Sequence, residues 1–176
     1  YLGKFRHDYD AGLIDAEQYW RLIGDGLGIE IDWRVALKAD NDSWEGVHED
    51  MVELARELHA AGVPIALLSN EPRELTALTR ARREWIALFA PVVFSGEVGL
   101  AKPDPAIFRL GVDKLGFPAD EIVVVGDSYD KDIVPATRIG CQTIWLKSIG
   151  WSAYKGNETA DIVLSDFTEI KQVFAL

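Results

Sequence analysis

The segment Glu121-Ile-Val-Val-Val-Gly-Asp-Ser-Tyr-Asp-Lys-Asp132 joins an apolar run to a cluster of acidic residues. Its first part predicts a short strand buried on both faces. Asp127, Asp130 and Asp132 then follow within six residues. Carboxylates this close repel one another unless a cation lies among them, and hard oxygen ligands suit Mg²⁺. The segment therefore predicts a magnesium site at a strand end. The alternative is that Asp130 or Asp132 caps the next helix and the other carboxylates are solvated.

Similar short apolar segments recur on both sides of this strand and alternate with helical patterns. Continuous apolar strands separated by helices are typical of a parallel sheet covered on both faces. We therefore expect a doubly wound parallel α/β fold from about residue 46. The further strands are expected at 63–68, 91–94, 142–146 and 161–164, and helices at 47–61, from 71, at 105–115, up to 138 and from 166.

The first third of the chain has a different, helical pattern. Asp15 is a good helix start, and the glycines from Gly24 to Gly28 are expected to end that helix. A second short helix is expected over 33–38. The polar, turn-rich stretch 38–46 predicts a boundary, so residues 1–45 form a small helical piece and residues 46–176 an α/β domain.

Charge and composition exclude several classes of partner. The chain has 176 residues with 18 basic and 29 acidic side chains, a formal net charge of −11. Such a surface repels nucleic-acid phosphates and anionic lipids, so neither nucleic acid nor a membrane is expected as a partner. The single cysteine, Cys141, allows no internal disulfide and favours a reducing, cytoplasmic location. It is expected to be a small buried apolar residue.

Two further groups follow predicted strands, where ligands bind in such sheets. Ser69 and Asn70 come directly after the strand at 63–68. They suit an anion such as phosphate at a helix N-terminus, although either could simply cap that helix. Lys102 follows the strand at 91–94, in the sequence Lys102-Pro-Asp-Pro. Taken alone it would be read as a surface charge.

The order of these motifs resembles the haloacid dehalogenase (HAD) superfamily, in particular the group with a helical cap between its first two motifs. Three of the family's four motifs are present in order: Leu-Leu-Ser69-Asn70, Lys102-Pro-Asp-Pro and Val-Val-Gly-Asp127-Ser-x-x-x-Asp132. The resemblance implies a Rossmann-like core over 46–176 and a partial cap over 1–45. It implies that Ser69 and Asn70 bind the phosphoryl group, that Lys102 neutralises nucleophile and phosphate, and that Asp127 binds Mg²⁺ with direct or water-mediated support from Asp132.

The family's first motif, an Asp-x-Asp turn after an N-terminal strand, supplies its nucleophile and acid/base. Asp8-Tyr-Asp10 copies the pattern but follows the polar stretch Lys4-Phe-Arg-His, which cannot be a central strand. We interpret it as a link between two cap helices. The first-motif strand is then expected to lie outside this sequence, in about 20 further residues. In the family that strand is central, so its absence would leave a gap in the sheet.

The resemblance implies a Mg²⁺-dependent phosphatase that acts on a small phosphorylated metabolite through an aspartyl-phosphate. The chain as given would lack the nucleophile and be inactive. Within the family, a phosphomutase or a haloacid dehalogenase is the alternative, although acidic residues around Asp127 would repel a carboxylate substrate. From a different class, the chain could be a non-catalytic phosphate- and metal-binding module. One of Trp33, Trp44 and Trp151, which lie near loops, is a candidate to line a substrate pocket.

Overall fold

The computed structural model describes residues 2–44, 46–147, 160–165 and 169–174. It divides into two compact units, Tyr1–Ala101 and Lys102–Leu176, each described here by itself. The predicted boundary near residue 46 falls inside the first unit. Within the described ranges, every helix is too short or too polar to cross a bilayer.

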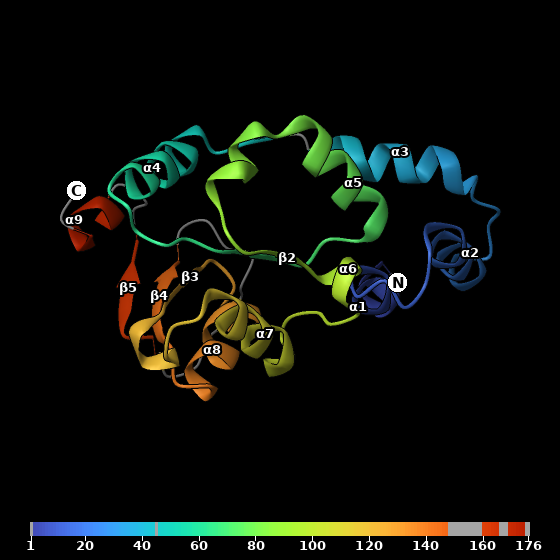
Figure 1. The fold of residues 1–176 in the computed structure, drawn as a ribbon. Coiled ribbons are helices and arrows are strands. Elements are labelled where there is room, and N and C mark those ends of the chain that lie inside the picture. Colours follow the sequence, from blue (N-terminus) through green and yellow to red (C-terminus); the bar gives the residue numbers. More distant parts are fainter. Residues whose placement is uncertain (1, 45, 148–159, 166–168, 175–176) are drawn as a thin grey trace. The chain divides into compact units, whose positions relative to one another are not determined.

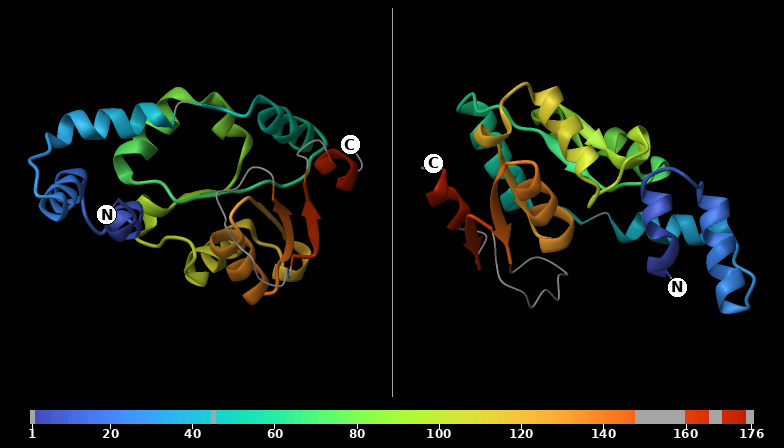
Figure 2. Two further views of the ribbon diagram at one scale, coloured as in Figure 1. Left: turned by 180° about the vertical axis from the view of Figure 1, so that it is seen from behind. Right: turned by 90° about the horizontal axis from the view of Figure 1, so that it is seen from below.

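The first unit combines a helical N-terminal part with a two-stranded parallel sheet (Figure 1). Its helices α1 and α2 lie side by side (Figure 2), and the stacked rings of Tyr9 and Tyr19, 4.5 Å apart, form the core between them. Its elements are α1 (Leu2–Asp10), α2 (Ala16–Leu27), α3 (Trp33–Ser43), α4 (Glu49–Ala60), β1 (Leu67–Ser69), α5 (Arg73–Arg82), η1 (Glu84–Leu88), β2 (Val92–Phe94) and α6 (Ser95–Val98).

The second unit is a three-stranded parallel sheet in the order β3-β4-β5 with helices packed against it. Trp145 on β4 is buried against Tyr129, with ring centroids 5.0 Å apart, and Ile133 completes this cluster. The elements are α7 (Pro105–Leu115), η2 (Ala119–Glu121), β3 (Val123–Gly126), the π-helical turn η3 (Tyr129–Ile133), α8 (Val134–Arg138), β4 (Gln142–Leu146), β5 (Ile162–Leu164) and α9 (Ile170–Val173).

The expected doubly wound parallel α/β fold is confirmed, since every described strand pair is parallel and helices lie between β1 and β2, between β2 and β3, and between β3 and β4 along the chain. The described strands nevertheless form two separate sheets, β1-β2 and β3-β4-β5. Among the described strands, β1 pairs only with β2, and β3 pairs only with β4. Each therefore keeps one edge without a partner among the described strands.

The N-terminal helices correct three details of the prediction. The helix that begins after Asp15 runs through Gly24 and ends only at Gly28, whose φ of 69° suits a glycine C-cap. The helix from Trp33 continues to Ser43, so the expected turn-rich stretch after residue 38 is wrong over 38–43. The Asp8-Tyr-Asp10 segment lies in α1, so it is not a turn after a strand. Its interpretation as a link between two helices is wrong, because the connection to α2 begins only after Asp10.

Candidate active site

The turn after β3 is organised around the carboxylate of Asp132, which is 5% exposed. Its Oδ2 accepts a hydrogen bond from the backbone N–H of Ser128 at 2.9 Å. Its Oδ1 pairs with the Nζ of Lys102 at 2.6 Å. Both partners are largely buried, with side-chain exposures of 16% for Lys102 and 7% for Asp132. The lysine of one predicted motif and the second aspartate of another therefore meet in the second unit.

Gly126, the last residue of β3, is required by this packing. A Cβ at this position would lie 2.3 Å from the Cβ of Asp132 and 2.8 Å from its Oδ2. Real Cβ atoms do not approach that closely, so only glycine lets the Asp132 side chain fold back onto the strand end. The Gly-Asp-x-x-x-x-Asp spacing thus has a direct steric cause.

Asp127 is placed differently from Asp132. Its backbone carbonyl accepts a hydrogen bond from Nε1 of the buried Trp145 at 3.0 Å, which fixes the residue at the end of β3. Its half-buried carboxylate has no hydrogen-bond or ion-pair partner within the part of the chain that the structure describes. A fixed carboxylate with available oxygens fits Mg²⁺, which takes one or two carboxylates and keeps several waters. By donor chemistry, the residues present fit the metal.

The three carboxylates do not form one cluster. Among the described residues, no group of three His, Cys, Asp or Glu side chains lies close enough to hold a metal ion. Asp130 is exposed, and the ammonium group of Lys102 offsets the charge of Asp132. The alternative that Asp130 or Asp132 caps the following helix is also wrong, because Ser128 is the N-cap of η3 and its Oγ accepts from the Lys131 N–H.

In the first unit, Ser69 ends β1 and Asn70 follows it. The alternative that either residue caps the next helix is wrong, because α5 begins at Arg73 with Pro72 as its N-cap and no side-chain capping bond. Ser69 is half-buried. The pair belongs to the loop at the carboxyl end of the strand, where ligands bind in parallel sheets.

Sequence reasoning missed the residues that hold this loop. The fully buried Ser95 follows β2, and its Oγ accepts from the backbone N–H of Glu71 at 2.7 Å and donates to the carbonyl of Asp10 at 2.5 Å. Gly96 lies so close to the same loop that a Cβ on it would be 2.7 Å from the backbone nitrogen of Arg73. Glu71 itself is 8% exposed, its Oε1 has no hydrogen-bond partner among the described residues, and burial raises the pKa of its carboxyl. A lone serine and glycine after a strand give no sequence signal for this role.

Cys141 is buried, as expected, and burial raises the pKa of its thiol. Trp145 is in the core. Of the tryptophans proposed near loops, Trp33 lines a pocket of the first unit, and Trp151 lies outside the described residues.

The second unit thus holds a lysine–aspartate pair and an open carboxylate at one strand end of a parallel α/β fold, where ligands bind in such sheets. The family model for haloacid dehalogenase-like hydrolases matches residues 3–140, and the chain belongs to this family. A phosphoserine phosphatase from Thermus thermophilus is 30% identical over 114 residues, which is 65% of this chain and 45% of that protein. A phosphoglycolate phosphatase from Pectobacterium atrosepticum is 32% identical over 126 residues, 70% of this chain and 51% of that protein. The chain thus matches about half the length of these relatives.

Solved structures of the family share the fold. A HAD family enzyme from Bacteroides thetaiotaomicron, crystallised with magnesium and inorganic phosphate, gives a TM-score of 0.68 at 22% identity over 82% of this chain and 77% of that chain. An L-2-haloacid dehalogenase gives a TM-score of 0.72 at 20% identity over 90% of this chain and 70% of that chain. At these identities the likeness supports the fold alone.

Proposed function

We propose that the protein is a Mg²⁺-dependent phosphatase that acts on a small phosphomonoester. The observation that carries this proposal is the end of β3, where the Lys102–Asp132 pair lies in the same turn region as the open carboxylate of Asp127. A cation and a metal-binding carboxylate held together suit a phosphoryl group, whose reactions depend mainly on positioning and charge stabilisation. The phosphatase relatives and the magnesium- and phosphate-bound family structure favour this reading.

Within this proposal, Asp127 is the direct ligand of Mg²⁺. Both oxygens of Asp132 already have partners, so this residue would orient Lys102 and the turn, with at most a water-mediated contact to the metal. The metal would supply a positive charge for the phosphoryl oxygens. Lys102 would supply a second one, and the Ser69 hydroxyl and the backbone near Asn70 would donate hydrogen bonds to the same group. Removing one such donor costs roughly 3–4 kcal/mol of barrier in comparable sites.

The nucleophile in this proposal is the first aspartate of an Asp-x-Asp motif at the end of a further strand. The aspartate carboxylate would attack phosphorus, the bond to the alkoxide leaving group would break, and water would then hydrolyse the aspartyl-phosphate. The helical part of the first unit would act as the cap that excludes water.

A non-catalytic module that binds phosphate and metal is the second candidate. The Asp8-Tyr-Asp10 segment, which copies the first motif, lies in a helix and does not itself supply the nucleophile. Within the family, a phosphomutase would use the same residues, whereas a haloacid dehalogenase needs no metal and would leave Asp127 without a role.

Phosphate release by the full gene product, measured with and without Mg²⁺, tests the proposal. Suitable substrates are a panel of sugar phosphates, nucleotides and phosphoglycolate. We expect turnover that requires Mg²⁺ and is lost in Lys102→Ala and Asp127→Asn. Turnover of a 2-haloacid without metal would favour the dehalogenase. Absence of turnover with Mg²⁺ binding intact would favour the module.

We also propose a reducing, cytoplasmic location, which the single buried Cys141 supports.

A further inference from the structure

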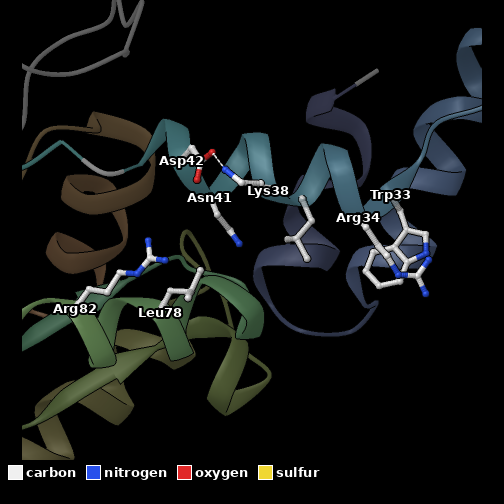
Figure 3. Close-up of a pocket in the computed structure, with 8 residues that line it drawn as sticks. Trp33, Arg34, Lys38, Asn41, Asp42, Leu78 and Arg82 are labelled. Carbon is white, nitrogen blue, oxygen red and sulfur yellow. Dashed lines mark hydrogen bonds and ion pairs between the residues drawn. The ribbon is translucent and has the colours of Figure 1, made fainter.

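A pocket of about 400 Å³ lies between α3 and α5, entirely within the first unit (Figure 3). Its apolar lining comes from Trp33 and Leu37 on α3 and from Leu78 on α5. Three cationic side chains surround this lining: Arg34 and Lys38 on α3 and Arg82, the last residue of α5. The pocket therefore combines an apolar floor with positive charge.

The pocket lining has more basic than acidic side chains, whereas the chain as a whole is acidic. The sequence has 18 basic and 29 acidic side chains, yet the pocket lining has three cations and one carboxylate. That carboxylate, Asp42, is engaged by Lys38 at 2.5 Å, as Figure 3 shows. A local excess of cations on an acidic protein concentrates anions at that point.

The pocket is held open by contacts at several points along α3, a helix that has no buried residue of its own. Trp33 and Leu37 pack against the core between α1 and α2. Further along, Asp40 pairs with Arg6 of α1 at 3.1 Å. At the C-terminal end, the Trp44 carbonyl accepts a hydrogen bond from Arg83. Because these contacts fix α3, a ligand would need little rearrangement to enter.

Two polar features of the lining are suited to recognise a ligand. The Arg34 guanidinium carbon lies 4.3 Å from the centroid of the Trp33 ring, so the cation is stacked and oriented. Asn41 points from α3 toward α5 in Figure 3, and its buried Oδ1 has no hydrogen-bond partner among the described residues. A buried acceptor without a partner is costly, and a ligand hydroxyl would supply the missing donor.

We propose that this pocket is a second ligand site, which binds a small organic oxyanion with an apolar portion. Arginine guanidinium groups pair with both phosphate and carboxylate oxygens, so the oxyanion is the shared chemistry. The site is separate from the proposed phosphoryl site. Ser69 precedes α5, whereas Arg82 ends it, and a helix of 10 residues is about 15 Å long.

Titration of ¹⁵N-labelled protein with phenylphosphonate, followed on the indole N–H signal of Trp33, tests this site. Trp33→Phe assigns the signal. We expect saturable shifts, and a dissociation constant at least about fivefold larger in Arg34→Gln and in Arg82→Gln. Arg56→Gln is the matched control, because Arg56 is an exposed arginine on α4 that pairs with Glu53 and is no part of the pocket. Both pocket arginines are exposed, so their replacement should leave the fold intact.

Two comparison ligands and two protein variants test whether binding is specific to this pocket. Benzoate should shift the same signal if the site binds carboxylates as well as phosphonates. If phenylphosphonate binds and benzoate does not, the site is specific for phosphoryl groups. Benzyltrimethylammonium, which has the ring but the opposite charge, should not bind. Ser69→Ala and Lys102→Ala should leave the titration unchanged, whatever they do to phosphatase activity. The proposal is overturned by equal binding of the cation, by no shift up to about 10 mM ligand, by unchanged affinity in both arginine variants, or by loss of binding in Ser69→Ala.

Discussion

Replacing Gly126 with alanine tests how the end of β3 is built. The added Cβ would lie 2.3 Å from the Cβ of Asp132. The φ of Gly126 is outside the left-handed region, so alanine brings no backbone strain and its effect is steric. The Asp132 side chain must therefore move, and it can no longer hold both the Lys102 ammonium and the Ser128 N–H.

The magnitude follows from those two interactions. Separating a buried ion pair costs about 3–5 kcal/mol, and losing a hydrogen bond to a charged group costs about 1.5–3 kcal/mol. Lys102 keeps some access to water, with a side-chain exposure of 16%, which reduces the first cost. Since the turn can relax in part, we expect the free energy of unfolding to fall by about 2–4 kcal/mol.

Urea unfolding, followed by tryptophan fluorescence, measures this loss. The buried Trp145 of the same unit contributes to the signal. Gly111→Ala is the matched control, because a Cβ at Gly111 in α7 meets no atom within 4 Å and alanine favours a helix. We expect the control to gain about 0.5–1 kcal/mol. A Gly126→Ala protein as stable as the wild type would refute the steric argument.

Three further changes test other parts of the structure. Burial raises the pKa of Glu71 above its ordinary value, so folding favours the protonated carboxyl, and stability should fall as the pH rises from the ordinary pKa through the raised one. Glu71→Gln should remove this pH dependence and stabilise the protein at pH 7 by about 1–2 kcal/mol, measured by thermal unfolding at several pH values; the exposed Glu53→Gln should do neither. Ser95→Ala should cost about 1–3 kcal/mol, because it leaves the buried N–H of residue 71 without an acceptor; an unchanged urea midpoint would contradict this. Asp15→Ala should cost about 1 kcal/mol in the same assay, since its Oδ1 caps α2 by accepting from the Gln18 N–H at 2.8 Å; no loss would show that the cap contributes nothing.

Elements with strong local signals were predictable from the sequence. Helix α7 begins at Pro105, after the Asp104 N-cap, and ends at Leu115, before the C-cap Gly116, and these are its predicted bounds. Strand β4 also has its predicted bounds. The extension of α3 beyond Lys38 was not predictable in this way. Polar residues there fit a turn equally well, and the ion pair from Asp40 to Arg6, 34 residues away, stabilises the helix.

The candidate site, like the fold, was predictable only in part. The motif order indicated that Lys102 and Asp132 share a site, and they are in contact. The charge of Asp132 is offset by the ammonium group of Lys102, 30 residues away in the sequence, and this ion pair was not predicted. The role of the buried Ser95 was not predictable, since its hydrogen-bond partners lie 24 and 85 residues away in the sequence. That Ser69 meets this turn stays a prediction.

Calorimetric titration with Mg²⁺ in the presence of inorganic phosphate tests the proposed metal site most directly. Asp127→Asn is compared with Asp130→Asn, which removes an exposed carboxylate from the same turn. We predict that Asp127→Asn weakens Mg²⁺ affinity at least about tenfold with little loss of fold, while Asp130→Asn changes it less than about twofold. Equal Mg²⁺ affinity in the wild type and Asp127→Asn would contradict the assignment of this strand end as the magnesium and phosphoryl site.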